Sequence, residues 1–175
     1  MQNNQQPKPP LWLRLTALAV AAALVGVDHL IKRWAVNTLA PGGAAHGGAV
    51  TAIPGVLGLQ YTENTGISFS MFGDSRAAMY VVTAITGAVM LAGVIALLAG
   101  RLAAIAPLWS GTLILAGGVG NLIDRVAQGY VVDCFEFLFV RFAVFNFADI
   151  CISAGVVWLA GWVLFGEVRR KKAAA

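Results

Sequence analysis

The chain has 175 residues, of which 59% are hydrophobic and only 11% are charged, and its mean hydropathy is +0.78. Soluble domains are typically about 25% charged, so this composition indicates an integral membrane protein, and the length leaves room for one compact bundle. The net charge of +4 does not indicate nucleic-acid binding, because the basic residues lie at the ends of apolar segments rather than in one patch. Cys134 and Cys151 form no CxxC pair and are expected to be buried hydrophobic residues rather than a disulfide.

The first apolar segment is predicted to be a membrane span over about residues 11–36. Residues 1–10 are polar and contain proline, which is typical of a tail. A cleaved signal peptide is the alternative, but its apolar region is only about 7–15 residues long, so a retained span is preferred. Asp28 and Lys32 lie one helical turn apart near the end of this span and are predicted to form an ion pair. The pair is either a local contact at the membrane boundary or part of a site.

Residues 37–75 are predicted to leave the membrane and to form a small β-rich element. Short β-prone pieces are interrupted there by glycine, proline and an Asn-Thr-Gly sequence, and the region is too polar for a span. The ENTG sequence at 63–66 is by itself typical of a turn.

Three further spans are predicted at about 76–100, 102–123 and 147–165. Small residues in the second span suit close helix packing, and Gly117 and Gly118 in the third would allow another backbone to approach. The segment 126–146 mixes aromatic with charged residues and is predicted to lie at the membrane surface.

Four spans place both termini on one side of the membrane. That side carries seven of the twelve Lys and Arg residues, including the basic cluster at 169–172, and the other side carries five. The positive-inside rule therefore predicts cytoplasmic termini. The polar groups near residues 28, 64 and 121–149 then converge at the outer leaflet.

Half of the eight acidic residues lie between 117 and 149, namely Asp124, Asp133, Glu136 and Asp149. Carboxylates this close to hydrocarbon are costly, so they normally have a partner or a task. Asn121, Asp124 and Arg125 share one face of a helix, and Asp124 is predicted to be structural and held by Arg125. Glu136 has no evident role.

Asp133 and Asp149 are the candidate catalytic pair. Asn146 can cap the fourth helix with Asp149 as its third residue, so capping alone is one explanation for these two. Asp133 has no such local partner. Two carboxylates brought together share a proton, so one can act as a base toward water while the other acts as an acid. A helix N-terminus favours the anion, which suggests that Asp149 is the ionised member.

Other catalytic designs lack their residues. The sequence contains no HExxH, GxSxG or P-loop, and His29 and His46 form no metal-ligand pattern with a cysteine. A serine–lysine pair would need Ser68 or Ser70 near Lys32, and nothing in the sequence favours either. A proton-coupled transporter or channel subunit is the alternative function, but it predicts carboxylates near the bilayer midplane and often an internal repeat. A purely structural membrane protein would need no converging aspartates.

Five blocks of the sequence, in this order, resemble the lipoprotein signal peptidases, also called signal peptidase II. They are VDHLIK at 27–32, ENTG at 63–66, GNLIDR at 120–125, VVD at 131–133 and FNFAD at 145–149. The resemblance implies a membrane aspartic endopeptidase of bacteria that removes the signal peptide from diacylglyceryl-modified prolipoproteins, cleaving before the lipidated cysteine. It implies an all-α membrane fold in a single domain, 1–175, with four transmembrane helices, a small periplasmic β-rich cradle and a second periplasmic segment.

The resemblance also implies how the site is composed. Asp133 and Asp149 would be catalytic, without a metal or cofactor, and the cyclic peptide globomycin would inhibit the enzyme. The residues expected to support the site or its substrate are Asp28, Lys32, Asn64, Gly66, Asn121, Asp124, Arg125 and Asn146. The expected partners are diacylglyceryl-prolipoproteins and membrane lipid, with no nucleic acid, and the expected state is a monomer in the bacterial inner membrane with its active site toward the periplasm.

Overall fold

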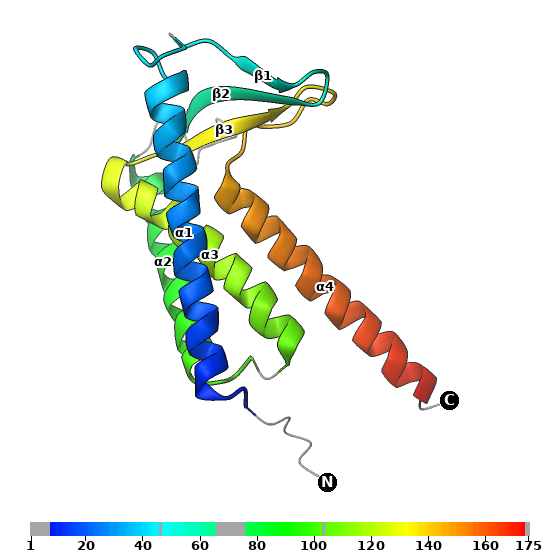
Figure 1. The fold of residues 1–175 in the computed structure, drawn as a ribbon. Coiled ribbons are helices and arrows are strands. Elements are labelled where there is room, and N and C mark those ends of the chain that lie inside the picture. The colour runs from blue at the N-terminus through cyan, green and yellow to red at the C-terminus, as the bar shows by residue number, and fades with distance from the viewer. Residues whose placement is uncertain (1–7, 46, 66–75, 103, 174–175) are drawn as a thin grey trace.

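The computed structural model describes residues 8–45, 47–65, 76–102 and 104–173, and these contain four long helices. The helices are α1 (Leu11–Leu39), α2 (Arg76–Leu98), α3 (Ile105–Gln128) and α4 (Phe147–Ala173) (Figure 1). Each contains an apolar stretch long enough to cross a membrane. The predicted four-span membrane fold is therefore confirmed.

The helix ends differ from the predicted spans where the backbone, rather than hydropathy, sets them. The third span is predicted to end at residue 123, whereas α3 continues to Gln128. Gly129 then adopts a φ of 84°, and its N–H donates to the carbonyl of Arg125, which is the left-handed cap that ends the helix. The charged residues at 124 and 125 thus mark the edge of the apolar run but not the end of the helix. α1 and α4 also continue past their predicted ends.

Three antiparallel strands form one sheet in the order β1-β2-β3. They are β1 (Val50–Ile53), β2 (Leu57–Asn64) and β3 (Val131–Phe137). The first two strands confirm the predicted β-rich element after the first span. β3 comes from the segment 126–146, which is predicted as a separate surface segment but in fact joins this sheet.

β2 continues through Asn64, so the prediction of a turn at 63–66 is wrong for its first two residues. Glu63 and Asn64 both pair with the start of β3. The hydrogen bonds to β3 outweigh the local preference for a turn. Because β3 is distant in the sequence, the ENTG sequence alone does not indicate this pairing. Gly66 lies outside the described residues.

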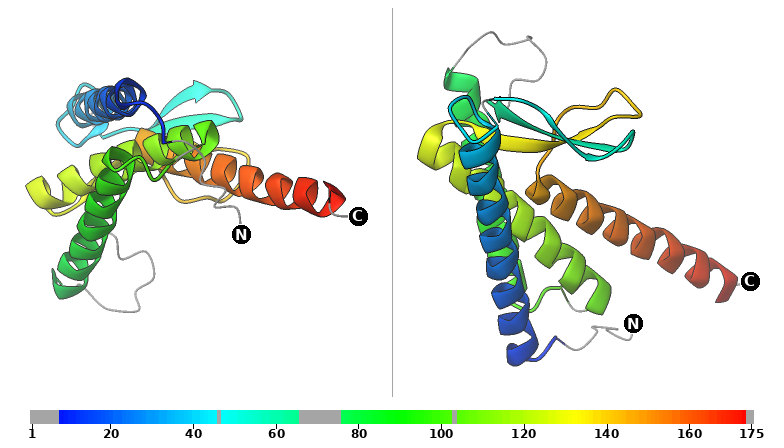
Figure 2. Two further views of the ribbon diagram at one scale, coloured as in Figure 1. Left: turned by 90° about the horizontal axis from the view of Figure 1, so that it is seen from below. Right: turned by 45° about the horizontal axis from the view of Figure 1, so that its top comes forward.

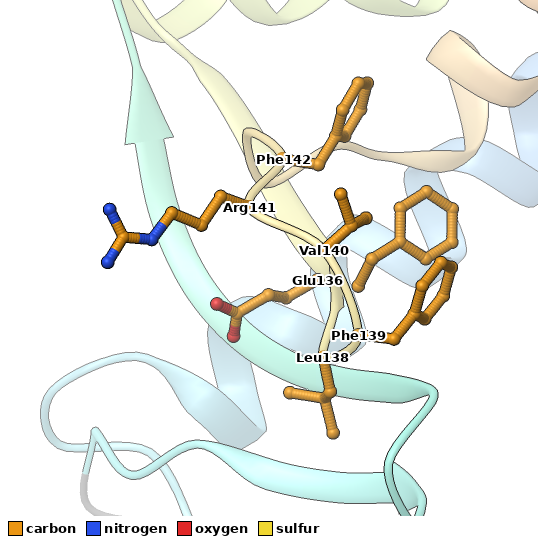
Figure 3. A pocket seen from close by; sticks show the side chains of 7 residues that line it. Glu136, Leu138, Phe139, Val140, Arg141 and Phe142 are labelled. Atoms are coloured by element: carbon orange, nitrogen blue, oxygen red, sulfur yellow. The ribbon is translucent and has the colours of Figure 1, made fainter.

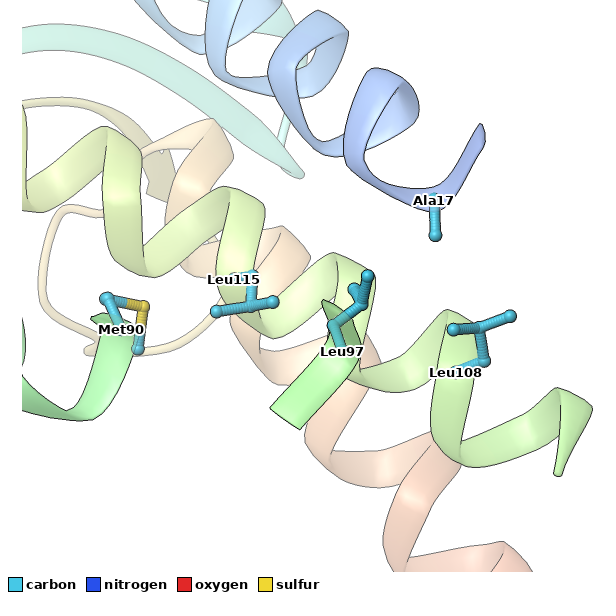
Figure 4. Close-up of a cluster of buried hydrophobic side chains, with 5 residues drawn as sticks. All are labelled: Ala17, Met90, Leu97, Leu108 and Leu115. Atoms are coloured by element: carbon cyan, nitrogen blue, oxygen red, sulfur yellow. The ribbon is translucent and has the colours of Figure 1, made fainter. Parts of the chain in front are cut away.

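Figures 1 and 2 show the sheet lying across one end of the helix bundle, with the start of α1 and the end of α4 at the opposite end. Ala35 and Leu39 of α1 pack against Val132 and Cys134 of β3, and all four are buried. A second cluster joins α1, α2 and α3 farther from the sheet (Figure 4) and consists of Ala17, Met90, Leu97, Leu108 and Leu115. Large apolar side chains on all four helices stay exposed, as expected of surfaces that face lipid.

A glycine lets α3 approach the start of α4 closely. A side-chain carbon on Gly117 would overlap the backbone carbonyl oxygen of Ala148, which confirms the predicted close approach of a backbone. Gly118 differs, because it faces the sulfur of Met90 rather than a backbone. The contact at Gly117 fixes the first turn of α4, which carries Asp149, against α3.

Candidate active site

α4 begins with a capping box formed by Asn146 and Asp149, as their spacing predicts. Oδ1 of Asn146 accepts a hydrogen bond from the backbone N–H of Asp149 at 3.0 Å, and Oδ2 of Asp149 accepts one from the backbone N–H of Asn146 at 3.1 Å. The exposed N–H groups of a helix N-terminus also favour a negative charge at this position. The carboxylate of Asp149 is therefore held by the backbone N–H of Asn146 while the residue remains half-buried.

Asp133 lies in β3, and both of its carboxylate oxygens accept hydrogen bonds from asparagine side chains. Its exposure is only 1%. Nδ2 of Asn146 donates to Oδ1 at 2.6 Å, and Nδ2 of Asn64, at the end of β2, donates to Oδ2 at 2.9 Å. Asn146 thus donates a hydrogen bond to Asp133 from its side chain and one to Asp149 from its backbone. It therefore brings the two predicted catalytic residues together.

Asn121 of α3 links this pair to the charged residues of α1. Its Nδ2 donates to Oδ1 of Asp149 at 2.9 Å. Its Oδ1 accepts from Nζ of Lys32 at 2.9 Å and from Nδ2 of Asn146 at 3.1 Å. Because an ammonium group can only donate, Lys32 fixes the amide of Asn121 with its oxygen toward α1 and its NH₂ toward Asp149.

Lys32 is also the centre of a buried ionic cluster with Asp28 and Asp124, which we call the charged trio. Nζ of Lys32 lies 2.7 Å from Oδ2 of Asp28 and 2.8 Å from Oδ2 of Asp124. The predicted pair of Asp28 and Lys32 is confirmed, but it is more than a local contact. Asp28 also accepts a hydrogen bond from the N–H of Ala148 at 2.9 Å, and Asp124 accepts one from the N–H of Val132 at 3.4 Å. The charged trio therefore fastens α1 and α3 to the start of α4 and to β3.

Arg125 does not hold Asp124, contrary to the prediction. Among the described residues, the Asp124 carboxylate pairs with Lys32, while Nη1 of Arg125 donates to the backbone carbonyl of Asn121 at 3.3 Å. Successive residues of a helix point about 100° apart, so neighbouring side chains do not face each other. The partner of Asp124 comes instead from another helix.

Burial raises the pKa of Asp133 from its ordinary value of 3.8 to about 6. The hydrogen bonds from Asn64 and Asn146 and the charge of Lys32 act in the opposite direction, whereas the charge of Asp149 raises the pKa further. Among the described residues, no cation forms an ion pair with Asp133 or Asp149. A carboxyl with a pKa near 6 can hold or release its proton close to neutral pH, as acid–base catalysis requires.

The two cysteines are buried and unpaired, as predicted. Burial raises the pKa of the Cys134 thiol to about 12, so this thiol is a poor nucleophile. Within the described residues, no three histidine, cysteine, aspartate or glutamate side chains gather where they could hold a metal ion. Ser68 and Ser70, the alternative partners for Lys32, lie outside the described residues.

Two further polar residues stand apart from the pair. Glu136 follows Asp133 by three positions in β3, so alternation along the strand directs it to the opposite face of the sheet. His29 lies at the edge of the charged trio, where Nε2 is 3.7 Å from Oδ1 of Asp124. The sequence does not indicate the backbone donors at Ala148 and Val132, because every residue except proline has a main-chain N–H.

The family described as signal peptidase (SPase) II matches residues 20–165, a range that contains all five sequence blocks. The chain is 36% identical to the lipoprotein signal peptidase of Streptococcus thermophilus over 148 residues, which cover 84% of this chain and 92% of that protein. It is 38% identical to that of Latilactobacillus sakei over 144 residues, with coverages of 82% and 89%. It is 41% identical to that of Trichormus variabilis over 133 residues, with coverages of 76% and 79%.

The fold is similar to that of solved bacterial membrane enzymes. One, determined at 1.9 Å resolution, gives a TM-score of 0.73 at 23% identity and covers 92% of this chain and 98% of that one. Another, at 2.3 Å, gives a TM-score of 0.70 over 92% and 93%. At this level of identity the likeness establishes a shared architecture.

Proposed function

Because the chain belongs to the signal peptidase II family, we propose that Asp133 and Asp149 are the catalytic pair with which it removes signal peptides from prolipoproteins. It is a peptidase of the bacterial inner membrane, crossed by four helices. The observation that supports the pair is its position: two carboxylates from β3 and α4 bond to one asparagine, Asn146, and among the described residues neither carboxylate forms an ion pair. The proposed reaction class is therefore aspartic endopeptidase.

Asp149 is the base in the proposed mechanism and Asp133 the acid. The helix N-terminus favours a negative charge on Asp149, and burial favours the neutral form of Asp133. A water between them gives a proton to Asp149 as its oxygen attacks the scissile carbonyl carbon, while Asp133 protonates the carbonyl oxygen. When the C–N bond breaks, the proton on Asp149 passes to the departing amine, and Asp133 recovers its proton from the intermediate.

The surrounding amides position the pair. Asn146 and Asn64 aim the carboxylate of Asp133, and Asn121 aims that of Asp149. Their hydrogen bonds hold the reacting oxygens without neutralising them, since an amide carries no charge. We assign Arg125 and Gly66 to contacts with the substrate backbone.

The substrate cysteine carries a diacylglyceryl group, so the site belongs at the hydrocarbon boundary. The pair lies where the sheet meets the helices, and the excess of Lys and Arg at the other end of the bundle orients both termini toward the cytoplasm. The site then faces the periplasm. The prolipoprotein enters sideways between helices while the acyl chains on its cysteine stay in lipid. A single copy of the chain suffices, and globomycin competes for the same site.

The transporter alternative is not favoured. It predicts carboxylates near the bilayer midplane, whereas Asp133 lies in β3 and Asp149 at the start of α4, both at the sheet end of the bundle. A peptidase is also what the family and the relatives indicate.

Single variants Asp133→Asn and Asp149→Asn test the pair. Each should lower the turnover of a lipidated prolipoprotein in detergent by on the order of 10²–10⁴-fold, because each removes one partner of the proton transfer. Glu136→Gln makes the same chemical change in the same strand, outside the network, and should cleave normally. Near-normal turnover by either aspartate variant, with its melting temperature preserved, would disprove the proposed mechanism.

A further inference from the structure

The sheet has an apolar end that projects from the protein, and we call it the sheet tip. It forms where the turn between β1 and β2 meets the end of β3, because the N–H of Leu138 donates to the carbonyl of Val56 at 3.0 Å. Its exposed apolar side chains are Ile53, Val56, Leu138, Phe139, Val140 and Phe142. Phe139 and Phe142 are 66% and 62% exposed, which is unusual for aromatic rings outside the membrane-spanning helices.

These two rings belong to a packed aromatic cluster rather than to a loose loop. The ring of Phe137 lies 5.3 Å from that of Phe139, 5.8 Å from that of Phe142 and 4.9 Å from that of Phe145, centre to centre. Aromatic pairs at such distances attract each other, so the exposed rings are held in place. Phe145 lies just before α4, and the cluster therefore joins the sheet tip to the start of a membrane span.

The sheet tip lies on the same side of the bundle as α4 in Figures 1 and 2. The first turns of α4 also expose apolar side chains, such as Ile150, to the surroundings. In a membrane protein that surface faces lipid. Through the aromatic cluster, the exposed apolar side chains of the sheet tip adjoin the start of α4, which is one end of its apolar span.

The sheet tip has a polar side as well. Figure 3 shows the side chains of Glu136 and Arg141 on one side of the loop and Phe139 on the other. An apolar face with a flanking cation is the arrangement of segments that lie in the interface of a bilayer. The guanidinium group of Arg141 can bind a lipid phosphate while the rings reach the acyl boundary.

We propose that the sheet tip is seated in the outer leaflet of the bilayer, with Phe139 and Phe142 at the acyl boundary and Arg141 among the headgroups. The contact would fix the height of β3, which carries Asp133, relative to α4, which carries Asp149. It makes the sheet a second membrane-bound part of the molecule, besides the four spans. The inference rests on the membrane fold and does not depend on which residues are catalytic.

Spin labels at the sheet tip test the proposal without any measurement of cleavage. Phe139→Cys and Phe142→Cys are each labelled in the full chain reconstituted into phospholipid vesicles; the native cysteines are buried and should not compete for the reagent. Both labels should be more accessible to dissolved oxygen, which concentrates in lipid, than to a water-soluble nickel chelate. Ala44→Cys, exposed in the turn after α1, is the matched control and should show the reverse.

Three results would overturn the proposal. A label at Phe139 as accessible to nickel as the Ala44 control would place the sheet tip in water. Low accessibility to both reagents would indicate that a second copy or another protein covers it. Protection from nickel that appears only after a prolipoprotein is added would make the sheet tip a substrate contact instead.

Discussion

Two polar clusters meet at Asn121, and they stabilise buried carboxylates in different ways. In the charged trio, Asp28 and Asp124 bond directly to Lys32. In the other cluster, which we call the amide-linked pair, Asp133 and Asp149 accept hydrogen bonds from side-chain amides and a backbone N–H.

The difference lies in the kind of partner that each carboxylate has. In the charged trio, the ammonium group of Lys32 compensates the negative charge of two buried carboxylates. In the amide-linked pair no such ion pair forms among the described residues, and burial raises the pKa of Asp133. Lys32 donates to Asn121, which in turn donates to Asp149, and the charge of Lys32 also lowers the pKa of Asp133. One lysine thereby links the two clusters while its ion pairs stay within the charged trio.

Removing the cation of the charged trio should have the largest effect on stability. Lys32→Met would leave Asp28 and Asp124 buried without a counter-ion, which typically costs about 3–5 kcal/mol. Thermal melting in detergent measures the loss. Arg33→Met removes an exposed cation one residue away and should stay within about 0.5 kcal/mol of the parent. Equal melting temperatures for the two variants would contradict the central place given to Lys32.

The amide-linked pair should instead make the free energy of unfolding depend on pH. Because the pKa of Asp133 rises from 3.8 to about 6 on folding, the folded chain binds this proton more tightly than the unfolded chain. Its contribution to stability is complete below about pH 4 and is lost as the pH rises through 6, by roughly 3 kcal/mol in all.

Denaturation between pH 4 and 8, compared for the parent and Asp133→Asn, isolates this contribution, since all other carboxyls are common to both. The parent should lose stability relative to the variant as the pH rises. Glu136→Gln serves as the control, and its stability should follow the parent at every pH. If the difference in the free energy of unfolding between the parent and Asp133→Asn stayed constant with pH, burial would not raise the pKa of Asp133.

Features set by local sequence could be predicted, and those set by distant contacts could not. The four spans follow from apolar runs, and the capping box of Asn146 and Asp149 follows from a spacing of three residues. Asp28 and Lys32 lie one helical turn apart, so their ion pair also follows from local spacing.

The errors in the sheet and the site concern partners that come from elsewhere in the chain. The ENTG sequence is a good turn locally, but β3 pairs with its first two residues. The sequence favours Arg125 as the partner of Asp124, whereas Lys32, which binds Asp124, lies on another helix. The contact between Asp28 and the backbone of Ala148 joins residues 120 positions apart and has no counterpart in any local pattern.

A smaller change should move the titration of the amide-linked pair without destroying it. Asn64→Ala removes the donor to Oδ2 of Asp133, and since that hydrogen bond lowers the pKa of Asp133, its loss should raise the pKa further. A hydrogen bond to a charged group is worth about 1.5 kcal/mol, or about one pH unit. If neutral Asp133 is the catalytic acid, the alkaline limb of the kcat/KM profile should shift upward by that amount. Glu63→Gln, in the neighbouring position of β2, should leave the limb in place. If the acid limb of Asn64→Ala shifts upward instead while its alkaline limb stays in place, the ionised form of Asp133 is the active one.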